Sequence, residues 1–242
     1  MKTLRRWLPT VAMVVLVIVF ARLAVWQYHR AHQREAQIAA VDSALAAPAT
    51  RLVPATLAAL PRYAHVYADG RYDGAHQLLL KEMSEPGGTR VGYEVLTPFL
   101  FAGGGTLMVN RGWVAVDTGG NVHADLAAPA GLVRVAGHLA PLARPGLHLG
   151  GNPAHADAWP VRLLFPGWTE LERLYGRQLM HRTLLLAPTA AGGYGRNWNM
   201  KPYYGPQQNY SYMAQWIGFA VVVFALWLWF TIRRLRRKRS GT

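Results

Sequence analysis

Three short segments of the sequence combine charged, amide and aromatic side chains at spacings that would let them bind an anionic or flat molecule. The first lies at the outer end of an apolar run near the N-terminus and contains Arg22, Trp26, His29 and Arg30. Helical spacing places these four side chains on one face, with Gln27 beside it. A cationic and aromatic face of this kind suits an anionic amphiphile, such as a haem with its propionates or a lipid headgroup. Snorkelling of Arg22 to the headgroups explains the same pattern without a ligand.

The second segment, VNRGWV from Val109 to Val114, surrounds a glycine with polar and aromatic side chains in a predicted strand. Arg111 and Trp113 are two residues apart, so regular alternation puts them on one face, where they could stack as a cation–π pair. We interpret Asn110, Arg111 and Trp113 as a partner-binding segment. A structural Arg–Trp pair that holds the sheet together explains the same residues.

The third segment, GPQQNYSYMAQW, leads into a second apolar run near the C-terminus. Pro206 can start a helix there. One face of that helix would carry Asn209, Tyr212, Trp216 and Phe219. Polar and aromatic groups at membrane depth suit a flat cofactor or a partner helix, while anchoring by Tyr and Trp at the membrane interface is the simpler explanation.

Other reaction chemistry has little support in the sequence. The lack of cysteine excludes disulfides, cysteine zinc sites, CxxC redox centres and thiolate copper carriers. The nine histidines form no HExxH or HxH motif, and only His29 and His32 have a helical i, i+3 spacing. No GxSxG or SxxK motif marks a nucleophile, and the seven methionines form no MxxM cluster. We therefore expect no catalytic residue and no metal site, and the protein is predicted not to be an enzyme.

The first and third segments lie beside apolar runs that are long enough to cross a bilayer. The run from Trp7 to Trp26 spans roughly 28 Å as a helix, close to the ~30 Å of a hydrocarbon core. The second run covers residues 213–232, and tryptophans mark the edges of both runs. A cleaved signal peptide is the alternative for the first run, although RLAVW lacks a convincing small-residue cleavage site.

Positive charge is concentrated at the two ends of the chain. The formal net charge is +14, and nine of the 26 Lys and Arg residues lie within 2–6 and 233–239. This distribution predicts membrane orientation rather than a nucleic-acid-binding face. By the positive-inside rule, the expected order is a cytoplasmic N-terminus (1–6), a transmembrane helix (7–25), a periplasmic domain (26–212), a transmembrane helix (213–232) and a cytoplasmic basic tail (233–242). Tails of this length leave no room for a kinase or nucleotide-binding module.

The segment between the apolar runs is predicted to be mainly antiparallel β-structure. Residues 35–47 continue the first helix until Pro48, and alternating or β-rich segments follow at 62–70, 76–83, 93–101, 106–116, 132–139 and 183–188. Glycines 103–105 predict a hairpin, and residues 141–160 read as a loop. One helix is expected over 168–180, with capping-box spacing at Thr169 and Glu172 and a buried stripe of Leu171, Leu174, Tyr175 and Leu179. The expected fold is therefore a membrane-anchored α+β protein, with a small sandwich or barrel and one packed helix.

In this order along the chain, the three segments resemble the Surfeit locus protein 1 family of cytochrome c oxidase assembly factors, over nearly the whole length. VNRGW at 109–113 is the most specific motif. The other matching positions are Leu23, Trp26, Gln27, Arg30 and Arg34 near the first run, Gly92, Tyr93, Thr97 and Pro98 in the middle, and Tyr212, Gln215 and Trp216 near the second run. The sequence departs from the family pattern at Ala24, Met213 and Asn209.

The resemblance implies a non-enzymatic factor that assists haem a insertion into subunit I of a haem–copper oxidase, or stabilises that subunit. The plain Arg-rich N-terminus, without an amphipathic presequence, favours a bacterial inner membrane over a mitochondrial one. The implied cofactor-binding residues are Trp26, Gln27, Arg30, Asn209, Tyr212 and Trp216, which would hold haem a transiently. The family has a histidine at position 209 that is implicated in haem a binding. Asn209 is not a normal axial ligand for haem iron, so His29 on the first helix would be the substitute. The implied partners are subunit I, haem a synthase and the lipid bilayer, with no nucleic acid.

Two other classes remain open from the residues themselves. A two-helix-anchored periplasmic sensor or polysaccharide-chain regulator shares the two-helix layout, but short tails count against a sensor and the β-rich middle counts against a chain regulator. A membrane-anchored periplasmic hydrolase also fits the layout, although nothing in the sequence nominates a nucleophile.

Overall fold

The two apolar runs form the longest elements of the structure, the helices α1 (Leu4–Ala46) and α3 (Gln207–Arg239). The computed structural model describes residues 4–82, 91–142, 158–164, 166–201 and 204–239. Both helices are long and apolar enough to cross a membrane. Both predicted helices are therefore confirmed, and α1 includes the continuation that the sequence places before Pro48.

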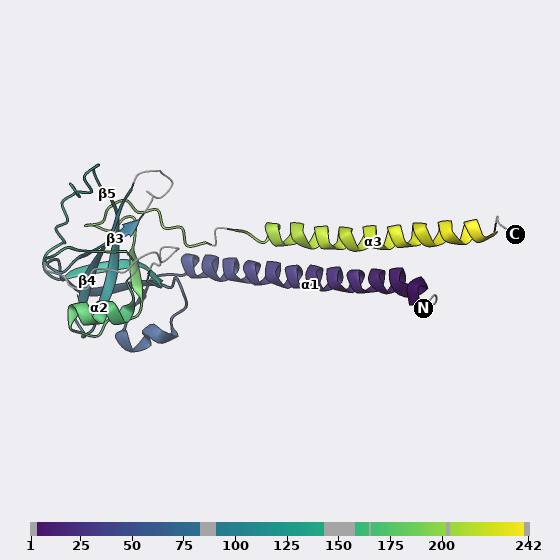
Figure 1. Cartoon of the computed structure of the whole chain (residues 1–242). Helices are drawn as coiled ribbons and strands as arrows, with labels where there is room; N and C mark the ends of the chain where they lie inside the picture. The colour runs from purple at the N-terminus through teal and green to yellow at the C-terminus, as the bar shows by residue number, and fades with distance from the viewer. Residues whose placement is uncertain (1–3, 83–90, 143–157, 165, 202–203, 240–242) are drawn as a thin grey trace. The chain divides into compact units, whose positions relative to one another are not determined.

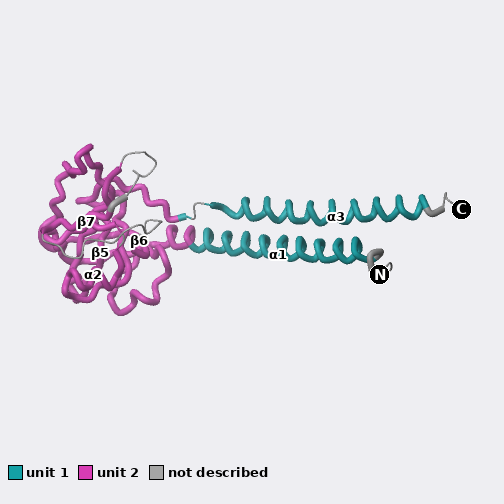
Figure 2. Tube along the Cα trace, viewed as in Figure 1, with its two compact units in different colours: residues 1–40, 201–242 teal, residues 41–200 magenta. Residues whose placement is uncertain are grey.

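The chain divides into two compact units, which Figure 2 colours separately. Residues 1–40 and 201–242 form the helical unit, and residues 41–200 form the β-rich unit. The β-rich unit falls inside the segment 26–212 that the sequence separates from the apolar runs.

Within the helical unit, α1 and α3 pack as an antiparallel pair (Figure 1). Near the chain termini, Trp227 Nε1 donates a hydrogen bond to Thr10 Oγ1 at 3.2 Å. Further along, the ring of Phe20 stacks on Trp216, with 5.7 Å between the ring centroids. The second contact lies later on α1 and earlier on α3 than the first, as an antiparallel pair requires. Ala24 is buried in the pair, and small side chains of this kind let two helices approach closely.

Among the strands that the structure describes in the β-rich unit, five close into a barrel. Their order around the ring is β2 (His65–Tyr72), β6 (Val133–Ala140), β8 (Thr183–Leu186), β5 (Thr106–Ala115) and β4 (Gly92–Phe101), and β4 pairs back onto β2. Beyond the ring, β3 (Leu78–Glu82) pairs with β4, β7 (Val161–Leu163) pairs with β3, and β1 (Thr50–Arg51) pairs with β2. The β1–β2, β3–β7 and β5–β8 pairs are parallel and the other described pairs are antiparallel. The prediction of mainly antiparallel structure is confirmed, and the barrel is the form that it takes.

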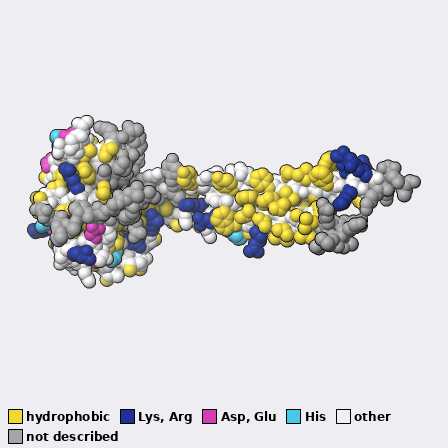
Figure 3. Space-filling view, viewed as in Figure 1, with side chains coloured by type: hydrophobic (Ala, Val, Ile, Leu, Met, Phe, Trp, Pro, Cys, Tyr) yellow, Lys and Arg dark blue, Asp and Glu magenta, His cyan; other side chains and the backbone are white. Residues whose placement is uncertain are grey.

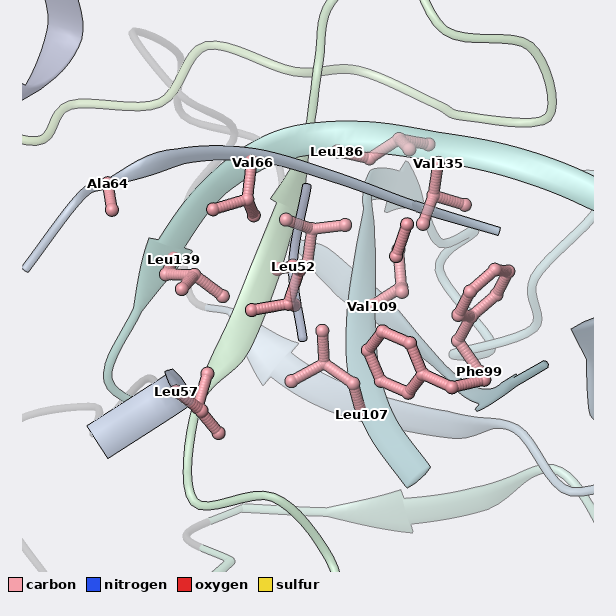
Figure 4. Close-up of a cluster of buried hydrophobic side chains, with 13 residues drawn as sticks. Leu52, Leu57, Ala64, Val66, Phe99, Leu107, Val109, Val135, Leu139 and Leu186 are labelled. Carbon is pink, nitrogen blue, oxygen red and sulfur yellow. The ribbon is translucent and has the colours of Figure 1, made fainter. Parts of the chain in front are cut away.

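The interior of the barrel is a dry cluster of aliphatic and aromatic side chains (Figure 4). Leu107 and Val109 of β5 point toward Phe99 of β4 and toward Val135 and Leu139 of β6. Period-two alternation brings one face of each strand to this cluster. Each fully buried side chain of this size contributes about 2 kcal/mol to stability.

Helix α2 (Trp168–Tyr175) covers part of the outer face of the sheet. Leu171 is fully buried there, in a cluster that includes Met108 of β5 and Leu78 of β3. Met108 lies between the interior residues Leu107 and Val109 in sequence, so β5 is buried on both faces. Leu171, Leu174 and Tyr175 of the predicted stripe are therefore confirmed as the packing face of α2, while Leu179 joins the same cluster from the loop after the helix.

The predicted extent and cap of this helix are wrong. Helix α2 ends at Gly176, which adopts a left-handed conformation with φ of 61°, five residues before His181. Its N-cap is Gly167, whose backbone N–H donates to Glu170 Oε2 at 3.4 Å. Glu172 instead accepts hydrogen bonds from Leu179 N and His181 Nε2, so it closes the loop after the helix rather than a capping box.

The predicted hairpin at glycines 103–105 is confirmed as the β4–β5 connection. Strands β1 and β7 and a short 3-10 helix (Pro54–Ala59) were not predicted, because none is long enough to show a hydrophobic period. Most of the loop expected over 141–160 lies outside the described residues.

Candidate functional site

The structure brings two of the predicted site residues into direct contact inside the helical unit. Asn209 Nδ2 on α3 donates a hydrogen bond to Gln27 Oε1 on α1 at 2.8 Å. Gln27 is buried together with Ala24 and Ala31, which follow the helical spacing i−3 and i+4. Gln27 and Asn209 are therefore a polar link between the helices.

A second polar link lies further along α1, at His32 and Glu35, five and eight residues beyond Gln27. Tyr210 OH donates to Glu35 Oε1 at 2.9 Å and lies 3.1 Å from His32 Nδ1. The sequence did not identify this link, because its partners lie on different helices and no spacing rule within one helix connects them. The one feature of the sequence that points to it is the i, i+3 spacing of His32 and Glu35, which places both side chains on one face of α1.

The other predicted residues of the helical unit lie on outward faces. Trp26 is 55% exposed and shares its face with exposed Arg30 at i, i+4 spacing. Tyr212 is 43% exposed on α3. Trp216 is half-buried against Phe20. The predicted set thus divides into interhelical residues and an outward aromatic and cationic face that lipid or another protein can reach.

Asn209 does not fit the role of an axial ligand to haem iron. An amide side chain is not among the ligands that hold haem iron. Asn209 also directs its amide group to Gln27, within a contact that the chain makes with itself. His29, the predicted substitute, is exposed on α1 with its ring edge against Tyr28. No step of haem chemistry follows from this geometry.

In the β-rich unit, Arg111 is a buried cation whose hydrogen-bond acceptors are uncharged carbonyl and amide oxygens. Its side chain is only 1% exposed. Its guanidinium donates hydrogen bonds of 2.6 to 3.1 Å to Gly192 O, Gln77 Oε1, Leu126 O and Ala127 O. These acceptors come from three separate parts of the chain. Arg111 therefore fixes the loops around residues 126 and 192 to strand β5.

The predicted stack of Arg111 on Trp113 is wrong. The guanidinium lies over Tyr72 and Tyr194, at 5.7 and 5.0 Å from the ring centroids. Gly112 has a φ of 111°, which breaks the strand alternation that the prediction assumed. Trp113 instead pairs through its backbone with Gly195.

Tyr72 and Tyr194 remain neutral next to this cation. Burial raises the pKa of Tyr72 to about 12, although the charge of Arg111 acts in the opposite direction. Burial also raises the pKa of Tyr194. Arg111 is thus held by carbonyl dipoles and ring faces.

Asn110 lies at a cavity in the β-rich unit. Its Nδ2 donates to Glu94 Oε2 at 2.9 Å, and its Oδ1 accepts from Gly112 N at 3.0 Å. Both Asn110 and Glu94 line a cavity of about 630 Å³. Trp168 and His181, which stack at an interplanar angle of 7°, line another part of it. Of the three predicted partner-binding residues, Asn110 lines this cavity and Trp113 lines a second cavity of about 470 Å³.

Gln77 is a polar hub that the sequence analysis missed. Its Oε1 accepts from Arg111 Nη1 at 2.9 Å and from Thr97 Oγ1 at 2.8 Å, and its Nε2 donates to Leu126 O at 2.8 Å. One feature of the sequence could have identified it: Gln77 is an amide that directly precedes the apolar run LLL of a buried strand.

Two of the nine histidines, His148 and His155, lie outside the described residues. Among the residues that the structure describes, no group of three or more His, Asp and Glu side chains could hold a metal ion.

Comparison with known proteins identifies one family. A family model described as the SURF1 family matches residues 14–221, which include most of α1, the whole β-rich unit and the first part of α3. No curated protein matches the chain.

Proposed function

The chain belongs to the SURF1 family, a family generally linked to cytochrome c oxidase assembly, and from this membership we propose that it is a non-enzymatic factor that stabilises subunit I of a haem–copper oxidase during maturation. The observation that carries the proposal is the extent of the family match, which includes most of α1, the whole barrel and the first part of α3. Partial matches to a common barrel would not extend into the helices.

The proposed location is a bacterial inner membrane, with α1 and α3 inserted, both termini in the cytoplasm and the barrel in the periplasm. Two observations support it. The helices are long and apolar enough to span, and the basic residues lie on the outer flank of each apolar run.

The proposed contact with subunit I is the outward face of α1 around Trp26 and Arg30, together with Tyr212 of α3. These side chains are exposed and combine aromatic surface with positive charge, whereas Gln27 and Asn209 are used between the helices. An exposed Trp–Arg face can pack against a membrane helix and pair with a polar group on it. Haem a synthase is a second proposed partner.

The test is a strain that lacks this gene, analysed by a reduced-minus-oxidised spectrum of its membranes and by oxidase activity. We expect the haem a signal and the activity to fall, and the intact gene to restore both. An unchanged spectrum and activity in a strain without a paralogue would overturn the proposal.

Complementation with variants then tests the contact face. Trp26→Ala combined with Arg30→Gln is expected to restore little oxidase while the protein itself stays at its normal level in membranes. Val25→Ala is the matched control, because Val25 is exposed on the neighbouring position of the same helix. Full restoration by the Trp26/Arg30 variant would exclude this face as the contact.

Asn209→His tests the position at which the family carries histidine. If the protein acts without ligating haem iron there, the wild-type chain supports oxidase assembly without this change, and Asn209→His adds nothing to it. A large gain in oxidase with Asn209→His would show that ligation at this position limits the function.

A further inference from the structure

At the end of the helical unit that carries both chain termini, α1 and α3 leave a groove of about 680 Å³ between them. The floor of the groove is apolar, with Met13 and Leu16 on α1 and Leu226 and Phe230 on α3. Figure 3 shows hydrophobic side chains along the visible face of these helices and dark blue Lys and Arg side chains gathered at this end.

The groove exists where the two helices meet through a large side chain. Trp227 reaches across to Thr10 with its indole N–H, and both residues line the groove. At the level of Ala24 and Ala31, in contrast, small buried residues let the helices pack closely. The space beside Trp227 is therefore a feature of this end of the pair.

Three arginines form the mouth of the groove: Arg233, Arg234 and Arg237. The helices supply no acidic residue near them, because residues 207–239 contain no Asp or Glu and the first acid of α1 is Glu35. The guanidinium of Arg233 lies over the ring of Trp229 at 5.1 Å, which holds it at the edge of the apolar surface. Guanidinium groups bind phosphate through two parallel hydrogen bonds.

We propose that this groove binds one anionic glycerophospholipid, with its phosphate between the three arginines and an acyl chain along the apolar floor. The inference rests on the proposed insertion of both helices in a membrane. An apolar floor next to a cluster of guanidinium groups matches a molecule that is apolar along its length and anionic at one end. A free phosphate would leave the apolar floor uncovered, and an apolar protein helix would make no use of the guanidinium groups that line the groove.

The test uses the full-length chain, purified in neutral detergent, with equal amounts of dioleoyl phosphatidylglycerol and dioleoyl phosphatidylcholine. Native mass spectrometry counts the lipids that stay bound. We expect one phosphatidylglycerol per chain to be retained in clear preference to phosphatidylcholine. Equal retention of the two lipids would overturn the proposal.

The arginine variants test the headgroup contact. A basic residue near an anionic lipid strengthens binding about fivefold, so Arg233→Gln, Arg234→Gln and Arg237→Gln combined should weaken phosphatidylglycerol retention on the order of 100-fold. Arg236→Gln is the matched control, since it removes the same charge from the same turn but Arg236 does not line the groove. An equal loss in the control would mean that net charge alone attracts the lipid, which would overturn the site.

A filling variant and a headgroup fragment test the acyl-chain contact. Ala12 lines the groove, and Ala12→Trp should occupy the floor and lower retention about tenfold, while the melting temperature of the barrel stays unchanged. Leu226→Trp repeats the test from α3 if the first variant does not fold. Glycerol phosphate should not displace the lipid at matched concentration, and displacement would show an anion site without a lipid groove.

The same preparation separates this inference from the proposed anchoring. If the chain leaves membranes on washing with alkaline carbonate, insertion itself fails. If the chain stays in the membrane but shows no lipid preference in detergent, only the groove proposal fails.

Discussion

Asn209 donates its side-chain amide to Gln27 Oε1 at 2.8 Å, and this one bond joins positions 182 residues apart in the sequence. It sets the register of α1 against α3, with the Phe20–Trp216 stack on one side and the Tyr210–Glu35 bond on the other. Asn209, one of the positions at which the sequence departs from the family pattern, is therefore part of the contact between the two helices.

Removing either amide should loosen the helix pair by a small and coupled amount. In a double-mutant cycle with Gln27→Ala and Asn209→Ala, we expect a coupling free energy of about 0.6 kcal/mol, typical of a hydrogen bond between membrane helices. The measurement is the unfolding free energy of the full chain in mixed micelles. Gln208→Ala, at an exposed neighbouring position of α3, should change little. Strictly additive single effects would show that the two amides do not interact.

Arg111→Lys should destabilise the β-rich unit by about 3 kcal/mol. Lysine lacks the planar fork that reaches Gly192 O, Gln77 Oε1 and Ala127 O, so buried acceptors would lose their donors. Urea unfolding, followed by fluorescence, measures the loss. Arg134→Lys is the control, because its side chain is 63% exposed and paired with Asp69 at the surface, and it should change the stability little.

The Arg111 result also separates two roles of the VNRGW segment. If Arg111→Lys lowers both stability and the amount of protein, Arg111 acts by positioning loops. If the variant stays as stable as Arg134→Lys and oxidase still falls, the predicted direct contact with a partner is favoured.

The stability of the barrel should fall as pH decreases through the range of histidine. Burial lowers the pKa of His138 below its ordinary value of 6.5, its hydrogen bond to Tyr63 O raises it, and the nearby His65 lowers it again. The unfolded chain then binds a proton more readily than the folded chain, so this contribution is complete above about pH 7.5 and is lost as pH falls below about 6.5. His138→Gln should make the melting temperature of the barrel less dependent on pH between about pH 8 and pH 5. His29→Gln changes a residue of the helical unit and should leave the melting temperature of the barrel as it is.

Gly137→Ala should prevent the barrel from closing properly. Gly137 lies in β6 between β2 and β8, opposite Val66 on one side and Leu186 on the other, and an added Cβ would collide with the backbone oxygen of Leu185. A fixed backbone on both sides cannot move away, so we expect a loss above about 3 kcal/mol or no soluble folded unit. Thermal unfolding by circular dichroism is the measurement. Gly103→Ala has open space around it and should be close to neutral, and similar losses at both positions would contradict the close approach at Gly137.

The sequence predicts the long elements of this protein because each contains a hydrophobic periodicity or a long apolar run within its own segment. Both helices, the β4–β5 hairpin and the packing face of α2 follow from patterns within single segments. The barrel closure does not, because the β2–β4 and β5–β8 pairs join distant strands and no local pattern encodes a partner.

The sequence predicted a set of residues for the candidate site. It did not predict which of them are buried between the helices and which are exposed. Trp26 and Gln27 are adjacent in sequence, yet one is exposed and the other is buried against α3, since helical rotation sends neighbours in different directions. The stack of Arg111 on Trp113 failed for a similar reason, because a single positive φ at Gly112 cancels the alternation of a strand.

Strand β8 has only four residues, Thr183–Leu186, and it separates β5 from β6 in the ring. Because translation proceeds from the N-terminus, every other strand of the ring leaves the ribosome before β8, and α3 follows after Gln207. A nascent chain without β8 exposes the free edges of β5 and β6, which are surfaces at which strands from different molecules pair. Premature termination between Ala140 and Thr183 would therefore yield an aggregation-prone product, and closure of the barrel belongs to the last stage of synthesis.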